Sequence, residues 1–209
     1  MKTTTAALAL SLAAASGLAN DLIAETLLVD FDDLAAAPST YNDAPDSKPL
    51  NLEGVTLFGG VLLGTEHYGV ADDAASQPNI YGTVHFEWSH SRTMTIDIHD
   101  PASSFATTLY NGLNRDLTFE VTAFDVQGNI VDSEAHRVIS FRGDGSHRFT
   151  VGDATGPNVV DYVEITQVTD YETFWGFAID DIEITTSVPA PGAAASLGLA
   201  GLLASRRRR

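Results

Sequence analysis

Residues 117–129 read LTFEVTAFDVQGN, and this stretch decides the fold. In residues 117–124, Leu, Phe, Val and Ala alternate with Thr, Glu and Thr, which is the period of a β-strand with one buried face. The next five residues end the strand, because Gly128 supplies a positive φ and Asp125 or Asn129 closes a turn through its side chain. The stretch therefore predicts a strand followed by a hairpin.

The same period of two recurs along the chain. It is found in residues 27–31, 93–98, 147–151, 162–168 and 174–184. A second turn signal, RGDGS at 142–146, separates two further strands, and no amphipathic helix pattern competes with them. Strands at roughly ten-residue spacing with turns between them indicate an all-β fold, an antiparallel β-sandwich of jelly-roll type. Residues 35–50, rich in Ala, Pro, Asp and Ser, predict a long surface loop.

The N-terminus has the pattern of a secretory signal peptide. Lys2 and a short polar run precede the apolar residues 6–15, and small residues follow. This stretch lacks the polar face, recurring every three or four residues, of an amphipathic helix. Cleavage after Ala19 fits best, with Ala24 as the second position. We therefore expect a signal peptide at 1–19 and a β-sandwich domain at 20–187.

The C-terminus mirrors the N-terminus. A proline motif and thirteen small or apolar residues at 192–204 are followed by Ser205 and four arginines. As a helix the apolar run reaches about 20 Å, which is less than the roughly 30 Å core of a bilayer and makes it a marginal anchor. The arginines are expected on the cytoplasmic side, which leaves the domain outside. The motif residues are Pro189, Ala190, Pro191, Arg206, Arg207, Arg208 and Arg209.

This order of proline motif, apolar helix and arginine run at 188–209 resembles the PEP-CTERM sorting signal of Gram-negative bacteria. The resemblance implies transient anchoring in the inner membrane, removal of the tail by an exosortase-type protease, and delivery to the cell surface or extracellular matrix. The motif departs from the family at Ala190, where a glutamate is usual. A C-terminal transmembrane anchor that is never cut is the alternative.

The charge and the cysteine content exclude several classes of ligand and of chemistry. Removing the two ends takes away five of the 11 basic residues and none of the 28 acidic ones, so the domain has a net charge near −22. Such a field repels nucleic acid and anionic membranes and favours cations, and it also keeps an exported protein soluble. The chain contains no cysteine, which excludes disulfides and thiolate chemistry.

Two acidic motifs, FDDL at 31–34 and IDDI at 179–182, interrupt the alternation in the same way. Each shifts the apolar phase by one residue, as a β-bulge or bend does. First and last strands often neighbour each other in jelly rolls, so these acids are expected to converge, and close carboxylates need a cation such as Ca²⁺. The candidate ligands of a structural calcium ion are Asp32, Asp33, Asp180 and Asp181. The alternative is that they cap strand ends at the surface.

A second resemblance covers most of the domain. FDDL, GVTLF at 54–58, VTAFDVQGN at 121–129 and FAIDDI at 177–182 look like the β-sandwich modules of sorted surface proteins. Those modules are similar in fold to galactose-binding-like and carbohydrate-binding jelly rolls. The resemblance supports the fold more than the ligand. Sugar binding needs aromatic faces for stacking, and aromatic side chains serve equally well as core. The candidates are Tyr68, Tyr81, Tyr110, Trp88 and Trp175.

Signatures of catalysis are missing from the sequence. It has no Gly-x-Ser-x-Gly, no His-Glu-x-x-His and no phosphate-binding glycine loop. Its six histidines are scattered, and its acids are too numerous to single out a glycosidase pair. We therefore expect a non-enzymatic cell-surface or matrix protein with a calcium-stabilised domain and an extracellular polysaccharide as partner. A secreted carbohydrate-active enzyme on the same scaffold, a glycoside hydrolase or lyase, is the alternative.

Overall fold

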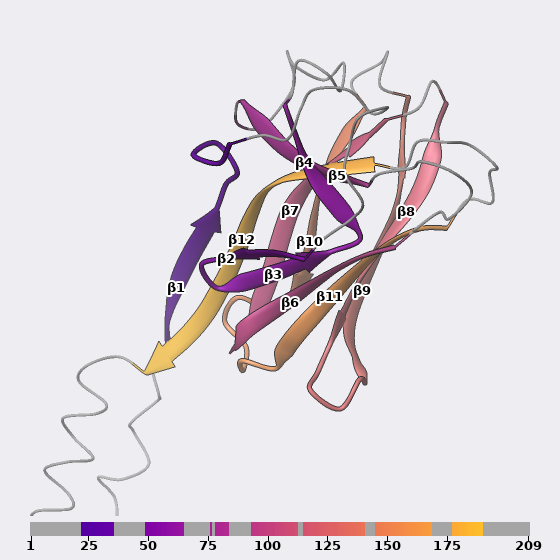
Figure 1. The fold of residues 1–209 in the computed structure, drawn as a ribbon. Helices are drawn as coiled ribbons and strands as arrows, with labels where there is room; N and C mark the ends of the chain where they lie inside the picture. The colour runs from indigo at the N-terminus through magenta and orange to yellow at the C-terminus, as the bar shows by residue number, and fades with distance from the viewer. Residues whose placement is uncertain are drawn as a thin grey trace, which may run out of the picture. The chain divides into compact units, whose positions relative to one another are not determined.

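Two antiparallel β-sheets form the domain in the computed structural model, which describes residues 22–35, 49–64, 76, 78–83, 93–112, 115–140, 145–168 and 177–189 (Figure 1). The first sheet has the strand order β10-β7-β12-β5-β4, and β1 also pairs with β12. The second sheet has the order β2-β3-β6-β11-β8-β9. The described residues contain no helix, so the predicted all-β sandwich is confirmed.

The strands match the alternating segments of the sequence. Their bounds are β1 Leu22–Val29, β2 Leu50–Leu52, β3 Val55–Phe58, β4 Gly60–Gly64, β5 Asn79–Thr83, β6 Thr93–Ala102, β7 Ser104–Asn111, β8 Leu117–Phe124, β9 Ile130–Val138, β10 Ser146–Gly152, β11 Val160–Gln167 and β12 Phe177–Pro189. In β8 every second side chain, starting with Leu117, is buried and the others face outward. One buried face per strand is what a two-sheet sandwich requires.

The hairpin predicted at 125–129 is present. The amide of Asp125 donates to the carbonyl of Asn129 over 2.9 Å, and that of Gly128 donates to the carbonyl of Asp125 over 2.9 Å. Gly128 has φ of 80°, and the Asp125 carboxylate accepts the amides of Gln127 and Asn129 at 2.9 Å each. The second predicted turn and most of the predicted loop at 35–50 lie outside the described residues.

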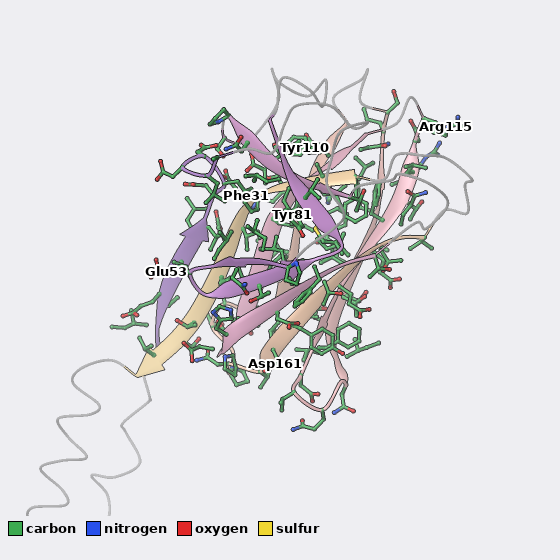
Figure 2. The ribbon with its side chains drawn as sticks, in the orientation of Figure 1. Phe31, Glu53, Tyr81, Tyr110, Arg115 and Asp161 are labelled. Carbon is green, nitrogen blue, oxygen red and sulfur yellow. The ribbon has the colours of Figure 1, made fainter. Side chains whose placement is uncertain are left out.

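The core fills the space between the sheets with side chains from both. Phe119 of the second sheet meets Phe177 of the first edge-to-face, with ring centroids 5.3 Å apart. Phe31 and Tyr81 stack with centroids 6.0 Å apart, and Figure 2 shows both rings inside the sandwich. β12 pairs with β7, β5 and β1, so it is the strand around which the first sheet is built.

Carboxylates of β9, an edge strand of the second sheet, bond to backbone amides of β10, an edge strand of the first sheet. The register of β9 with β8 points Asp132, Glu134 and His136 inward, toward β10 of the other sheet. Asp132 accepts the amide of Gly152 at 2.8 Å, and Glu134 accepts that of Thr150 at 2.9 Å. Inward charges and covered amides protect edge strands from pairing with other chains. We call these contacts the edge seam.

Two histidines extend the edge seam. His147 bonds to Glu134 over 3.0 Å, and its ring lies parallel to that of His136 with centroids 3.6 Å apart. Phe149 packs edge-on against both rings. The residues the structure describes hold no group of three or more acidic or histidine side chains arranged to bind a metal. The ring contacts of His136, His147 and Phe149 add to the packing of the seam.

Residues 24–187 form one compact unit, and residues 1–23 with 188–209 form another, of which only 22, 23, 188 and 189 are described. No helix in the described ranges is long and apolar enough to cross a membrane. The signal peptide, the apolar segment at 192–204 and the arginine run lie outside these ranges. Export, anchoring and tail removal stay predictions.

Two glycines with positive φ provide a test of this backbone. An added Cβ at Gly152 (φ 86°) would lie 2.4 Å from the Ser103 carbonyl oxygen, whereas at Gly128 (φ 80°) it would meet only the Tyr162 hydroxyl at 3.7 Å. We expect Gly128→Ala to cost about 1–2 kcal/mol, the price of a left-handed alanine, and Gly152→Ala clearly more. Urea unfolding measures both, and equal losses would contradict the Gly152 contact.

Candidate functional site

The last strand contains a bulge at its acidic motif. Asp180 pairs with Thr108 of β7 and Glu183 with Ala106, so two residues, Asp181 and Ile182, lie opposite one. Asp181 has φ of 48° and is the one non-glycine residue with positive φ in the described part of the chain. The phase shift read from the sequence is therefore a β-bulge, as predicted. It turns Ile182 back into the core, where it is fully buried.

Asp180 lies inside the domain with its carboxylate bonded. The carboxylate accepts the Ser76 amide at 2.9 Å, the Ser76 hydroxyl at 3.2 Å and the Asp181 amide at 2.9 Å. Burial raises the pKa of Asp180 to about 6, and the neighbouring Asp181 adds to the increase, while the bonds from Ser76 oppose it. The residue thus joins the segment at Ser76 to the bulge.

The first acidic motif differs in local structure from the second. β1 ends at Val29, and residues 31–34 form a turn in which the Leu34 amide donates to the Phe31 carbonyl over 3.2 Å. Of the bulge or bend predicted at Asp32 and Asp33, the structure has the bend, because the chain has already left the sheet. Asn79 of β5 holds the turn by donating its side-chain amide to the carbonyls of Phe31 (2.9 Å) and Leu34 (2.7 Å).

The two acidic motifs nevertheless approach each other. Burial raises the pKa of Asp181, the Ser76 hydroxyl opposes this, and the carboxylates of Asp30 and Asp32 raise it further. The Asn79 amide lies 3.4 Å from a carboxylate oxygen of Asp32. We call Asp30, Asp32, Asp180 and Asp181 the bulge cluster.

The bulge cluster contains three of the four predicted calcium ligands and one residue that was not predicted, Asp30. Asp32, Asp180 and Asp181 belong to it, whereas Asp33 is exposed in the turn. The sequence did not predict Asp30, because the alternation of β1 gives it the outward face next to buried Val29. Its position two residues before Asp32 was the available indication that both side chains share a face. No three of these side chains form a ready metal site within the described ranges, so calcium stays a prediction.

The predicted sugar-stacking residues are absent from the described surface. Tyr81 is fully buried, and its hydroxyl oxygen accepts the Gly60 amide at 3.1 Å. Burial raises the pKa of Tyr81 to about 12. The prediction of a sugar platform at Tyr81 is wrong, because the ring is part of the core, and Tyr110 is buried too. Tyr68, Trp88 and Trp175 lie outside the described residues.

A different pair of aromatic rings lies on the outer face of the second sheet. Phe124 of β8 and Tyr162 of β11 are cross-strand partners. Their rings are parallel within 7° with centroids 4.7 Å apart, and both are partly exposed. Phe124 occupies an outward position of residues 117–124, where the alternation predicts a polar residue. This exception was the only indication in the sequence of an exposed aromatic side chain here. We call these two residues the aromatic pair.

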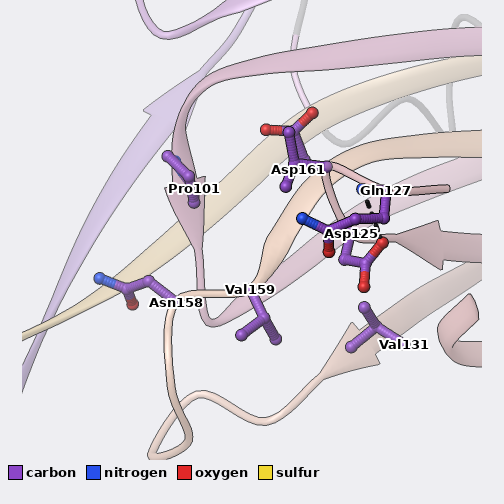
Figure 3. A pocket seen from close by; sticks show the side chains of 8 residues that line it. Pro101, Asp125, Gln127, Val131, Asn158, Val159 and Asp161 are labelled. Carbon is purple, nitrogen blue, oxygen red and sulfur yellow. Dashed lines mark hydrogen bonds between the residues drawn. The ribbon is translucent and has the colours of Figure 1, made fainter. Parts of the chain in front are cut away.

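A pocket of about 370 Å³ is lined in part by the sequence neighbours of the aromatic pair, and we call it the hairpin pocket (Figure 3). Asp125 follows Phe124, and Asp161 precedes Tyr162. Hydrogen bonds from Asn129 and its neighbours hold the pKa of Asp125 below its usual value, so Asp125 is ionised. The pocket is lined by Pro101, Asp125, Val126, Gln127, Val131, Asn158, Val159 and Asp161. It combines exposed apolar surface with amides and carboxylates.

Comparisons with known proteins do not place the chain in a family. No family model matches it, and no curated protein does. Among solved structures it is similar to a DUF4465 family protein from Bacteroides caccae (TM-score 0.49, 11% identity, 79% of this chain and 100% of that one). It is similar to the K2 cleaved adhesin domain of Lys-gingipain (0.43, 13%, 77% and 99%).

A third similar structure is a family 35 carbohydrate binding module from Clostridium thermocellum (TM-score 0.35, 15% identity, 67% of this chain and 98% of that one). All three TM-scores are below 0.5. The similarities therefore define neither a family nor a ligand for this chain.

The raised pKa of Asp180 predicts a pH dependence. Between its ordinary pKa of 3.8 and about 6 the folded state holds a proton that the unfolded state has lost, so in calcium-free buffer stability falls as pH rises through this range. The loss is on the order of 3 kcal/mol. Asp180→Asn removes this titration while keeping the side-chain shape. Urea unfolding at several pH values measures both proteins, and identical pH slopes would refute the assignment.

Proposed function

We propose that this protein is an exported, non-enzymatic binding module whose ligand is an extracellular polysaccharide and whose fold is reinforced by calcium. The observation that supports the ligand class most directly is the aromatic pair on an outer sheet face beside the hairpin pocket. Aromatic rings offer sugars an apolar face, and nearby polar groups fix the hydroxyls. Delivery to the bacterial surface through the C-terminal tail is part of the same proposal.

The chemistry of the pocket suits a polyhydroxylated ligand. Val126 and Val159 are 70% and 39% exposed, which is apolar surface for the carbon skeleton of a sugar. Gln127 and Asp161 contribute an amide and a carboxylate group that bond hydroxyls, while the amide of Asn158 bonds to the backbone of Ser187. A site with these two kinds of group recognises a sugar by shape and by hydrogen bonds together.

The sheet face extends beyond the pocket. Tyr162 pairs across the sheet with Asp97 of β6, and Asp97 pairs with Thr56 of β3. Thr56 donates to the Asn51 side chain over 2.9 Å. A row of outward polar groups therefore continues from the aromatic pair across neighbouring strands. Such a surface has room for several units of a polymer, which favours a polysaccharide over a single sugar.

The bulge cluster supports the calcium proposal. Burial is the main cause of the raised pKa values of Asp180 and Asp181, and neighbouring carboxylates add to both, which costs stability in the absence of a cation. Ca²⁺ accepts backbone carbonyl, hydroxyl and water oxygens in addition to carboxylates. Asp32 and Asp181 with nearby carbonyl groups are therefore suited to hold one ion between the turn after β1 and the bulge of β12.

The polysaccharide proposal predicts that the protein is retarded in gels that contain its ligand. Tyr162→Ala removes one stacking face and should weaken retardation about tenfold, whereas Tyr162→Phe keeps the ring and should bind nearly as well. Affinity electrophoresis against a panel of neutral, acidic and amino polysaccharides measures both, with melting curves as the control for folding. No retardation in any gel would reject the function.

The calcium proposal predicts that the melting temperature rises by about 5 °C or more with saturating calcium over chelator. Asp181→Asn should lose most of this increment, and in chelator it should melt no lower than the wild type, because asparagine tolerates the positive φ and removes a repelling charge. Asp33→Asn, in the exposed position beside the cluster, should keep the increment. A wild type insensitive to calcium would end the proposal.

A further inference from the structure

We propose that the ligand is a cationic polysaccharide, a polymer of amino sugars with free amines, bound at the aromatic pair and the hairpin pocket. This inference rests on the proposed polysaccharide function and adds the chemical class and the place. It is drawn from the charges around Tyr162, since carboxylates bond an ammonium group more strongly than a neutral hydroxyl and would repel a uronic acid polymer.

Acidic groups lie beside the aromatic pair and in the hairpin pocket. Asp97 is the cross-strand partner of Tyr162 on β6. Asp161 lines the hairpin pocket together with Asp125. Glu164 lies two residues along β11, and the alternation of the strand gives it the same outward face as Tyr162. The four carboxylates named here come from two strands, β6 and β11, and from the turn after β8.

The arginines of the described residues lie away from the aromatic pair, whereas His99 lies two residues from Asp97 on β6. Arg137 is the cross-strand partner of Thr118 at the far end of β8, six residues from Phe124 or roughly 20 Å along the strand. Its guanidinium forms an ion pair with Asp116 over 3.0 Å. Figure 2 shows Arg115 and Asp161 at opposite ends of the sandwich. The nearest titratable base is His99, which bonds to Thr56 over 3.0 Å.

A protonated amino sugar satisfies both features of the site. Its ammonium group is attracted by the face of an aromatic ring and donates charge-assisted hydrogen bonds to carboxylates. Its ring carbons cover the apolar surface at Val126 and Val159. A general acidity that only keeps the protein soluble would spread its charges without gathering them around exposed aromatic rings.

The experiment compares chitosan oligosaccharides with chitin oligosaccharides of the same length, in which the amines are acetylated. Isothermal titration of the protein produced from the full chain, in low-salt buffer at a mildly acidic pH that keeps the amines protonated, is expected to give at least roughly tenfold tighter binding of chitosan. Added salt should reduce that preference, because it screens the charges. An alginate oligosaccharide, which is a uronic acid polymer, should not bind.

Variants locate the interaction. The double variant Asp97→Asn, Asp161→Asn should lose about tenfold in chitosan affinity and little for chitin. Glu120→Gln removes one charge from the same sheet face, four residues along β8 from the aromatic pair, and should change neither affinity. Chitosan binding that falls equally in Glu120→Gln would mean unspecific attraction and would overturn the site.

Two outcomes separate this inference from the function on which it rests. Equal binding of chitin and chitosan, or binding of neutral glycans only, overturns the amino-sugar inference and leaves the polysaccharide function standing. Failure of the protein to bind any member of the panel overturns both. Tyr162→Ala, checked by melting for its fold, should abolish the chitosan preference, and an unaffected preference would place the binding elsewhere.

Discussion

The bulge in β12 is the constraint on which the first sheet depends. β12 pairs with β7 along its length, while its other edge pairs with β5 at Ala178 and Ile179 and with β1. One strand serves two partners on the same edge because the extra residue at Asp181 changes its direction and increases its twist. Asp180, buried beneath the bulge and bonded to Ser76, fixes the point at which this happens.

The second sheet is organised differently and faces solvent with a broad polar surface. In β8, side chains such as Phe119 and Val121 fill the core while Thr122 and Phe124 face outward. The register of this sheet shifts at Phe124 on β8 and at Tyr162 on β11, next to the aromatic pair. The two proposed sites lie on different sheets, with the cation at the bulge of β12 and the polymer at the aromatic pair.

Much of the fold was predictable because it depends on local patterns. The period of two in residues 117–124 and the turn chemistry of Asp125 and Gly128 require no knowledge of neighbours. The site was less predictable because it depends on register. Tyr81 looks like a surface aromatic until its partners bury it, and the contact of Phe124 with Tyr162 exists only because β8 pairs with β11 in one alignment. Asp30 joins its cluster through a turn that no pattern specifies.

The pairing of β1 with β12 also governs the order in which the chain assembles. Thr26 and Thr185, joined at 3.2 Å, are 159 residues apart, whereas Glu134 and Thr150 of the edge seam are 16 apart. Short loops close at low entropic cost and long ones late, so the seam belongs to an early nucleus and the meeting of the first and last strands to the final step. Until β12 has emerged, β7 and β5 lack the strand between them. Folding of this domain is therefore completed only after β12 has been synthesised.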